Sequence, residues 1–398
     1  QPDGTAFDAR LKGDEFFRVA TTLEGNAIIQ DEDGWWCYAI FDDEGRRGSS
    51  GWKVGGKTPS PILHESRQIP YEVLSAAAAE KRLRIQSLHT ASDSRPVPAT
   101  KNGNETIKHG IVILAQFEDV RFRYGKQDFT DLLTQDGYSR NGASGSAKEY
   151  FDEQFSGKLE FRFEVSDIVT LPGKRSEYGA NLSDGQDKDP TRMVIEACQK
   201  ADDMIDFTLY DDNNDGEIDN VFIFFAGGDE AEGAGEDCIW SHSWYVSDGA
   251  GQNVVLDGKM LNRYACCSEL TRRSIGGTID ETIVGIGTFC HEYGHTLGLV
   301  DLYDTDYAGS GGESASLWVW TSLMDGGNQN NLGNTPPHLN AIEREMLGIC
   351  EPVRIKTDGS YSLGPIDKTN TVYRLDTDNE DEYYLLECRS GTGWDSHI

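Results

Sequence analysis

Residues 290–301 read CHEYGHTLGLVD, and this stretch contains the pattern HExxH. On an α-helix, positions i and i+4 lie on one face, so His291 and His295 can bind the same metal ion. Neutral imidazoles are borderline-soft donors that suit Zn²⁺. Glu292 lies one position further round the helix and can reach a water molecule on the open side of the metal, where a carboxylate acts as general base. The alternative interpretation is an ordinary helix with two surface histidines.

The residues that follow the motif supply a third candidate ligand. Gly298 can adopt a positive φ, end the helix and turn the chain back towards the metal. This turn would bring Asp301 to the metal, and the full pattern becomes HExxHxxGxxD. The alternatives are that Asp301 only caps the turn, that Asp304 or Asp306 takes its place, or that the distant Glu343 is the ligand.

Two neighbouring stretches support a metal centre. Residues 278–289 carry only two charged side chains, so we expect the motif helix to be buried, where histidine and glutamate are costly unless they are satisfied. Residues 321–327 read TSLMDGG and place Met324 in a tight turn, as in the methionine turn below the metal of metzincins. The alternative is that Met324 is a plain core residue.

The rest of the chain predicts an α+β protein in four parts. Residues 1–85 form short β-strands separated by turns, including one over 35–41, and a helix over 70–84. Residues 86–107 have no periodicity and are expected to be an exposed linker. From 108 to 350, the apolar runs 110–117 and 221–225 predict buried strands, 159–165 a further strand, and helices are expected to begin at Ser146 and Pro190. Residues 351–398 follow as a separate segment.

The composition narrows the possible functions. The 398 residues contain 36 basic and 68 acidic side chains, a net charge of −32, so polyanions such as nucleic acid are repelled and are not expected partners. No apolar run approaches the ~18 residues of a membrane helix, so no membrane span is expected. The hydrophobic fraction of 37% is enough for sizeable cores. The eight cysteines form no CxxC pair, which excludes a zinc ribbon.

An acidic stretch at 211–219 predicts a calcium site. It fits the spacing D-x-N-x-D-G, with the glycine at 216 allowing the sharp turn that a calcium loop needs. The candidate ligands are Asp211, Asn213, Asp215, Glu217 and Asp219. Position 12 of an EF-hand loop would be a phenylalanine here, so the prediction is a shorter calcium loop. The alternative is a polar turn without a metal.

The sequence resembles the immune inhibitor A-like secreted bacterial metallopeptidases, a metzincin group. The resemblance covers about residues 108–398. It is carried by HEYGH at 291–295 with DLYD at 301–304, LMDGG at 323–327, PHLNA at 337–341 with LG at 347–348, IWSHSW at 239–244, and the stretch from 145 to 151.

The resemblance implies a fold and an activity. The fold is a metzincin-like catalytic domain, a mixed twisted sheet with an active-site helix, preceded here by a small β-rich N-terminal domain. The activity is zinc-dependent endopeptidase action on protein or peptide substrates, with His291, His295 and Asp301 as zinc ligands and Glu292 as the base. Secretion, synthesis as a zymogen and calcium binding are also implied. Because members of the group continue beyond residues 393–395, we expect 351–398 to be the start of a C-terminal β subdomain.

The N-terminal part is the expected pro-region, which would be released by cleavage in 86–107. Metzincin zymogens can place a thiolate or carboxylate on the zinc, and Cys37 is the candidate residue, with Asp31 and Asp33 as substitutes. The alternative is that Cys37 is a buried strand residue. His242 and His338 are expected to be structural histidines rather than catalytic ones. The sequence predicts no oligomeric state.

Two other interpretations of the whole chain remain open. One is a thermolysin-like peptidase whose third ligand is a downstream glutamate such as Glu343. The other is a calcium-stabilised surface adhesion or binding module that carries an inactive, relic metal site.

Overall fold

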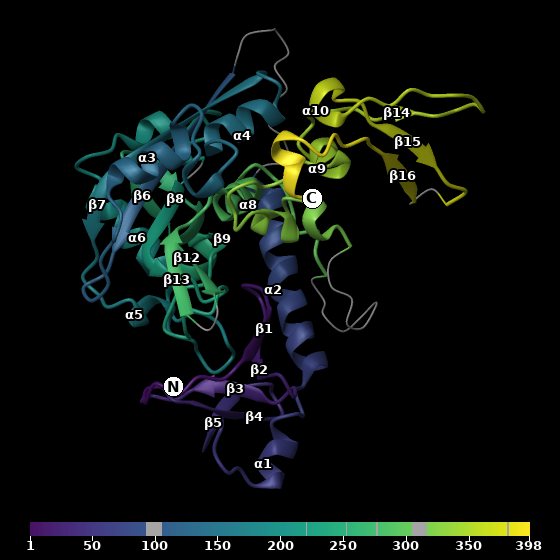
Figure 1. The fold of residues 1–398 in the computed structure, drawn as a ribbon. Coiled ribbons are helices and arrows are strands. Elements are labelled where there is room, and N and C mark those ends of the chain that lie inside the picture. The colour runs from purple at the N-terminus through teal and green to yellow at the C-terminus, as the bar shows by residue number, and fades with distance from the viewer. Residues whose placement is uncertain (93–105, 220, 252, 276–277, 305–316, 380–381) are drawn as a thin grey trace.

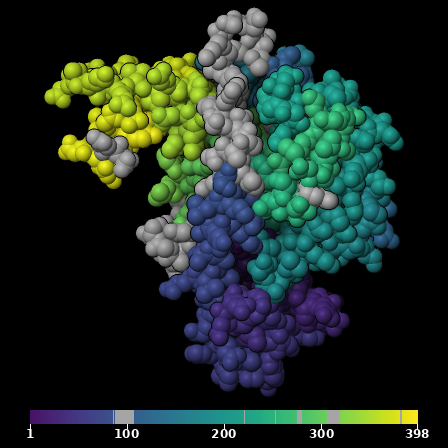
Figure 2. All heavy atoms as spheres, turned by 180° about the vertical axis from the view of Figure 1, so that it is seen from behind, coloured from purple at the N-terminus to yellow at the C-terminus, as the bar shows by residue number. Residues whose placement is uncertain are grey.

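A computed structural model describes residues 1–92, 106–219, 221–251, 253–275, 278–304, 317–379 and 382–398. It shows a small sheet formed by the N-terminal residues, a central mixed sheet covered by helices, and a C-terminal sheet that projects from the central part (Figure 1). The opposite view shows the N-terminal residues as one lobe in contact with the central part (Figure 2). Helices and sheets are both present, as the sequence predicts for an α+β protein.

The N-terminal lobe is a five-stranded sheet in which each strand pairs antiparallel with the next. Its elements are β1 (Ala9–Gly13), β2 (Arg18–Thr22), β3 (Ala27–Gln30), β4 (Trp36–Phe41), β5 (Arg47–Lys53), α1 (Ser60–Glu65) and α2 (Tyr71–Ser92). The helix expected over 70–84 is therefore longer than predicted and continues into the expected linker 86–107. Residues 93–105 of that linker lie outside the described part of the chain, and the next strand begins at residue 106.

One apolar cluster joins the N-terminal lobe to the central part. Phe16 and Phe17, which come just before β2, pack in the same buried cluster as Tyr245, with Trp244 against it. Tyr245 and Trp244 belong to β9 (His242–Tyr245) of the central sheet. Because apolar side chains from both parts share one cluster, the lobe packs against the central part and is not held to it by the connecting chain alone.

The central sheet has the strand order β13-β12-β8-β6-β7, with β9 also paired to β12. β6, β7, β8 and β12 run parallel, whereas β9 and β13 are antiparallel to β12. The strands are β6 (Thr106–Gln116), β7 (Leu159–Thr170), β8 (Val221–Gly228), β12 (Arg263–Ile275) and β13 (Thr278–Ile283). The strands predicted at 110–117, 159–165 and 221–225 are all present.

Both faces of the central sheet are covered, which explains the continuous apolar runs of β6 and β8. Ile111 and Ile113 of β6 pack in a cluster with α6 (Pro190–Ala201). Val112 and Leu114 point to the other face and pack in a cluster with α3 (Lys126–Thr134), α4 (Ala147–Gln154) and α8 (Ile286–Thr296).

The helices α4 and α6 begin where short sequence signals predict them. Ser146 and Glu149 form the capping box at the start of α4, and Pro190 occupies the first turn of α6. The motif helix α8 begins only at Ile286. Residues Thr278–Ile283, which the sequence pattern groups with this helix, form the strand β13 instead.

The C-terminal residues form a three-stranded sheet in the order β14-β15-β16. Trp394 packs against the central part, with its ring centroid 5.1 Å from that of Tyr150 in α4. The remaining helices and strands are α5 (Ser176–Gly179), α7 (Val246–Ala250), β10 (Val254–Leu256), β11 (Lys259–Leu261), α9 (Ala341–Met346), β14 (Val353–Arg354), α10 (Ile366–Thr369), β15 (Tyr373–Asp376) and β16 (Tyr383–Leu386). None of the helices in the described ranges combines the length and apolar character needed to cross a bilayer.

Candidate metal centre

The structure brings the three predicted zinc ligands together. His291 and His295 project from the same face of α8, with their rings perpendicular and 5.0 Å apart between centroids. Asp301 Oδ1 lies 3.3 Å from Nε2 of each histidine. Within the described residues, these three form the one group of at least three histidine, cysteine or acidic side chains close enough to hold a metal ion.

The donor set fits a zinc ion. Two imidazole nitrogens and one carboxylate oxygen are among the protein ligand sets of catalytic zinc sites, which keep a fourth position open. Asp301 Oδ1 is buried and accepts no hydrogen bond from the described residues. Such an orphaned carboxylate oxygen is costly in a protein interior unless a cation lies against it.

Backbone carbonyls orient both histidines. His291 Nδ1 lies 2.9 Å from the carbonyl oxygen of Leu323, and His295 Nδ1 lies 3.0 Å from that of Leu299. A carbonyl only accepts hydrogen bonds, so both Nδ1 atoms carry the proton and donate it. Both Nε2 atoms are therefore left with a lone pair that faces Asp301.

The turn after α8 has the predicted conformation. Gly298 adopts φ = 106°, as expected for a glycine that ends the helix. The N–H of Leu299 donates to the carbonyl of Gly294, and that of Leu302 donates to the carbonyl of Met324 at 2.8 Å. These bonds fold residues 298–302 back under the helix and place Asp301 beside the histidines.

Met324 packs directly against α8. A Cβ atom added at Gly294 would lie 3.2 Å from Met324 Sδ, closer than side chains normally approach. Gly294, which lies between the two histidines in the sequence, therefore allows the turn that contains Met324 to lie against the helix.

Glu343 supports this turn and is not a third ligand. Its Oε1 accepts hydrogen bonds from the Ser322 hydroxyl at 2.6 Å and from the Met324 N–H at 3.0 Å, and its Oε2 accepts one from the Asn340 N–H. The geometry therefore does not support the thermolysin-like alternative. Asp304, although described, is not part of the donor cluster, and Asp306 lies outside the described residues.

Charge and burial act together on the site. Burial raises the pKa of Glu292 to about 7, the histidines oppose the rise, and the charges of Asp301 and Asp229 add to it. The protonated form of Glu292 is therefore favoured more strongly in this buried site than it is in water.

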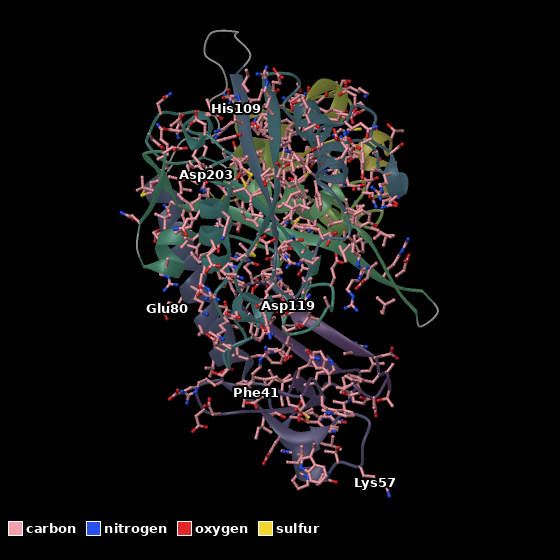
Figure 3. The ribbon with its side chains drawn as sticks, turned by 90° about the vertical axis from the view of Figure 1, so that its left-hand side faces the viewer. Phe41, Lys57, Glu80, His109, Asp119 and Asp203 are labelled. Atoms are coloured by element: carbon pink, nitrogen blue, oxygen red, sulfur yellow. The ribbon has the colours of Figure 1, made fainter. Side chains whose placement is uncertain are left out.

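Lysine side chains contact the acidic residues of 211–219, the candidate calcium loop. The Asp211 carboxylate accepts hydrogen bonds from the N–H groups of Asp215 and Gly216 and from Lys259 Nζ at 2.5 Å. Asp219 lies 3.5 Å from Lys108 Nζ. The loop also contacts His109 through Asp212. His109 lies at one end of the molecule, and the N-terminal lobe, which carries Phe41 and Lys57, lies at the opposite end (Figure 3).

The candidate latency residue Cys37 is not at the metal centre. It is fully buried in β4 of the N-terminal sheet, where its thiol contacts Asp31 Oδ2 at 3.4 Å. The prediction that Cys37, Asp31 or Asp33 reaches the metal is wrong, because this end of the sheet lies away from α8 (Figure 1). Cys37 is instead the strand residue of the alternative interpretation, and all eight cysteines are free thiols.

The two further histidines are hydrogen-bonded structural residues. His242 lies between the Trp240 carbonyl and the Tyr264 hydroxyl, at 2.7 and 3.0 Å. His338 is buried beside Gln154, and burial lowers its pKa to about 4. Neither contributes to the donor cluster.

Sequence reasoning missed the groups that orient the ligands. The carbonyls of Leu323 and Leu299 leave no signal in a sequence, because every residue has a carbonyl. The hydrogen bond from the Met324 N–H to Glu343 could not be predicted either, because the two residues are 19 positions apart and only the fold brings them together. Gly294 is the one signal that was available, as a glycine inside a helix often marks a close approach.

The helix with HExxH, the aspartate that returns to it and the turn at Met324 form a candidate metal centre on an α+β fold. Residues 102–348 match the family model described as the immune inhibitor A peptidase M6 catalytic domain. The chain belongs to this peptidase family.

Two curated relatives illustrate the similarity. The chain is 34% identical over 223 residues to immune inhibitor A of Bacillus thuringiensis subsp. alesti, covering 50% of this chain and 31% of the relative. It is 31% identical over 245 residues to the pre-pro-metalloprotease PrtV of Vibrio cholerae serotype O1 (strain M66-2), covering 54% of this chain and 25% of the relative. The chain thus spans a third or less of the length of these relatives.

Proposed function

We propose that the protein is a secreted zinc-dependent endopeptidase of the metzincin type, made as a zymogen. The observation that carries the proposal is the convergence of His291, His295 and Asp301 around a buried carboxylate oxygen that has no hydrogen-bond partner among the described residues. Membership of a peptidase family supports the reaction class. Secretion rests on the relatives alone.

Each residue of the site has a role in peptide hydrolysis. When bound, zinc would polarise the scissile carbonyl and lower the pKa of a water ligand to ~7. The two histidines and Asp301 would hold the ion, and Leu323 and Leu299 keep the imidazoles in the required tautomer. Glu292 would take a proton from the attacking water and deliver it to the leaving amine nitrogen.

An extended substrate fits the strand order. β9 pairs with β12 and with no other strand in the described part of the chain. A peptide can therefore add to the free edge of β9 by backbone hydrogen bonds, which favours unfolded or loop segments of protein substrates. The docked N-terminal lobe contacts this strand through Phe16 and Trp244, which supports the zymogen part of the proposal.

The test is zinc content and hydrolysis after release of the lobe. A specific protease site is placed within residues 93–105, the chain is cut, and the N-terminal fragment is removed in mild denaturant. We expect the remaining protein to hydrolyse casein. Asp301→Ala should lose most of its zinc and its activity, because the ion would retain only two protein ligands. Asp304→Ala is the matched control and should keep both. Full zinc content in Asp301→Ala, by elemental analysis, would contradict the ligand assignment.

We also propose that the loop 211–219 binds calcium in place of Lys259. Calcium binding to the folded state alone would stabilise it by about 2.7 kcal/mol at ~100 times the Kd. A rise in melting temperature with calcium, absent in Asp215→Asn and present in the exposed control Asp203→Asn, is the expected result of a thermal-shift assay. If calcium leaves the melting temperature of the wild type unchanged, the loop is a polar turn.

A further inference from the structure

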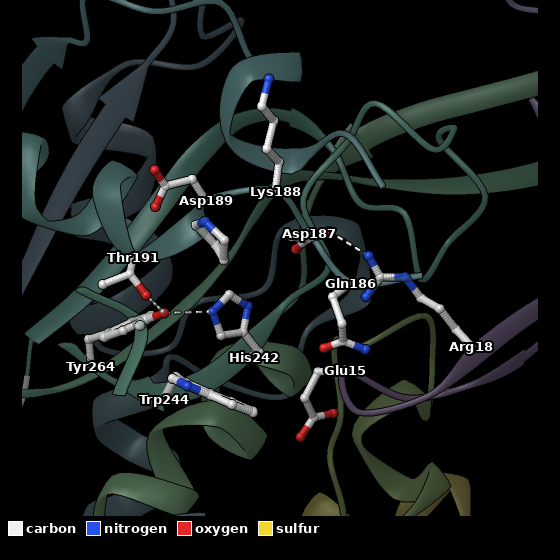
Figure 4. Close-up of a pocket in the computed structure, with 12 residues that line it drawn as sticks. Glu15, Arg18, Gln186, Asp187, Lys188, Asp189, Thr191, His242, Trp244 and Tyr264 are labelled. Carbon is white, nitrogen blue, oxygen red and sulfur yellow. Dashed lines mark hydrogen bonds and ion pairs between the residues drawn. The ribbon is translucent and has the colours of Figure 1, made fainter. Parts of the chain in front are cut away.

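A pocket in the central part of the molecule holds a cation that belongs to the N-terminal lobe. Arg18 Nη2 lies 2.5 Å from Asp187 Oδ1 and 2.7 Å from Glu230 Oε2. The same nitrogen donates a 2.5 Å hydrogen bond to Asn181 Oδ1. Figure 4 shows the side chain of Arg18 extending from the lobe towards Asp187. The cation of this pocket and its three acceptors therefore come from different parts of the molecule.

The walls of the pocket are built by the central part alone. Asp187 Oδ2 accepts a 3.1 Å hydrogen bond from the Trp240 N–H, and Glu230 Oε1 accepts one of 2.6 Å from Asn181 Nδ2. The ring of Trp240 adds an aromatic face, since Arg18 Cζ lies 5.0 Å from its centroid, within the range of a cation–π contact. An aromatic ring, an amide and two carboxylates thus surround the guanidinium, and hydrogen bonds within the central part hold them in place.

The two carboxylates depend on the lobe for a counter-charge. Their side chains are each 5% exposed, and in the described part of the chain Arg18 is the one cation with which either Asp187 or Glu230 forms an ion pair. Glu230 Oε2 is buried and has no hydrogen-bond partner among the same residues, so the guanidinium beside it is what offsets its charge. A buried carboxylate that loses its cation is left uncompensated. Departure of the lobe therefore leaves a pocket that favours another cation.

The pocket adjoins β9, the strand proposed to bind substrate. A cavity of about 180 Å³ lies between the lobe and the central part, and its lining includes Arg18, Asp187, His242 and Trp244. The last two residues belong to β9. A polypeptide bound along the edge of β9 can therefore place a side chain in the pocket.

The lobe shows how one short stretch of chain contacts both places. Phe16 stacks on Trp244 of β9, with ring centroids 5.0 Å apart, and Arg18, two residues later, enters the pocket. Phe17 lies between them and faces the lobe, where its ring is edge-on to that of Tyr71 at 6.1 Å. An extended peptide likewise presents every second side chain to the surface beside it.

We propose that this pocket binds a basic side chain of the substrate polypeptide once the lobe has left, and that Arg18 occupies it until then. The proposal rests on the peptidase and zymogen parts of the proposed function and adds a class of substrate to them. A guanidinium suits the pocket because it lies against Trp240 while it contacts both carboxylates. An ammonium group offers three donors to the three acceptors but has no planar face. We therefore expect arginine to be preferred to lysine.

The first test measures binding to the uncut chain and needs no hydrolysis. Arg18→Ala and Arg18→Gln empty the pocket, and the probe is N-acetyl-arginine amide, with N-acetyl-glutamine amide as the neutral comparison. Because a ligand of the folded state stabilises it, we expect the melting temperature of both variants to rise with the concentration of the arginine derivative only. The wild type should not respond, since its pocket is already filled.

Variants of the pocket itself supply the control. Asp187→Asn or Glu230→Gln, each combined with Arg18→Ala, should abolish the response to the arginine derivative. Asp184→Asn in the same background should keep it, because Asp184 lies three residues from Asp187 but its side chain is 51% exposed. Circular dichroism checks that each variant is folded. Equal responses of Arg18→Ala to the two derivatives, or a response that survives Asp187→Asn, would overturn the proposal.

The second test measures the cleavage preference of the cut chain on a mixture of peptides. At one fixed distance from the cleaved bond, we expect arginine to be enriched by about tenfold or more, and lysine less, since a hydrogen bond to a charged group contributes at this level. Asp187→Asn should lose the enrichment, and Asp184→Asn should retain it.

The two tests separate this proposal from the proposed function. If the arginine derivative binds but the cut chain hydrolyses nothing, the pocket is a site for a basic side chain and the peptidase function fails. If the cut chain hydrolyses peptides and no basic residue is enriched at any position, the peptidase function stands and the present proposal fails.

Discussion

Glu292→Gln is expected to abolish peptide hydrolysis while the protein keeps its metal. Glutamine has nearly the same size but cannot accept a proton from the attacking water. General bases typically contribute about 10²–10⁴-fold to a rate, so kcat of the cut protein should fall by at least about that range. His291, His295 and Asp301 are unchanged, so zinc content by elemental analysis should match that of the wild type.

The exposed glutamate Glu118 supplies the control, and Glu118→Gln should retain full activity. Equal activity of Glu292→Gln and the wild type would remove Glu292 from the mechanism. If wild type and variant are both inert after the lobe has been removed, the interpretation as a binding module with a relic metal site gains support instead.

Arg18→Ala is expected to release the N-terminal lobe from the central domain. Arg18 is the first residue of β2, and its guanidinium lies 2.5 Å from Asp187 and 2.7 Å from Glu230 of the central part. Only 1% of its side chain is exposed, and the two carboxylates are 5% exposed. Removing one partner of a buried ion pair typically costs about 3–5 kcal/mol, because the other charges remain buried without compensation.

The measurement is protection of the lobe in the uncut chain. Amide hydrogen exchange in β1 and β2 and limited proteolysis should both become faster in Arg18→Ala. Arg46→Ala is the matched control, since Arg46 belongs to the same lobe but forms exposed ion pairs with Asp42 and Glu44, and such pairs contribute little. Equal protection in Arg18→Ala and Arg46→Ala would show that the ion pairs do not hold the lobe.

The elements that sequence alone could predict are those governed by short-range rules. The apolar run at 110–117, the capping box at Ser146 and the proline at 190 each specify their element locally, and all three elements are present. Parts of the site also follow from local rules. His291 and His295 share a helix face because they are four residues apart, and the turn at Gly298 requires a positive φ whatever surrounds it.

The parts that could not be predicted depend on contacts between distant residues. Residues 86–92 have no clear periodicity, yet they continue α2. Thr278–Ile283 becomes a strand because β12 lies beside it. The latency residue was sought at Cys37 for its chemistry, whereas the contact of the lobe with the central sheet is made by Phe16 and Phe17, which no local signal marks.

The apolar contact between the lobe and β9 has a consequence for the activation proposed above. Trp244 and Tyr245 are covered by Phe16 and its neighbours while the lobe is docked. Once the lobe has left, an aromatic strip beside the catalytic helix meets water, and exposed strips of this kind favour self-association. In the proposed activation, the form without the lobe is therefore expected to self-associate more readily than the uncut chain until a bound polypeptide covers the strip.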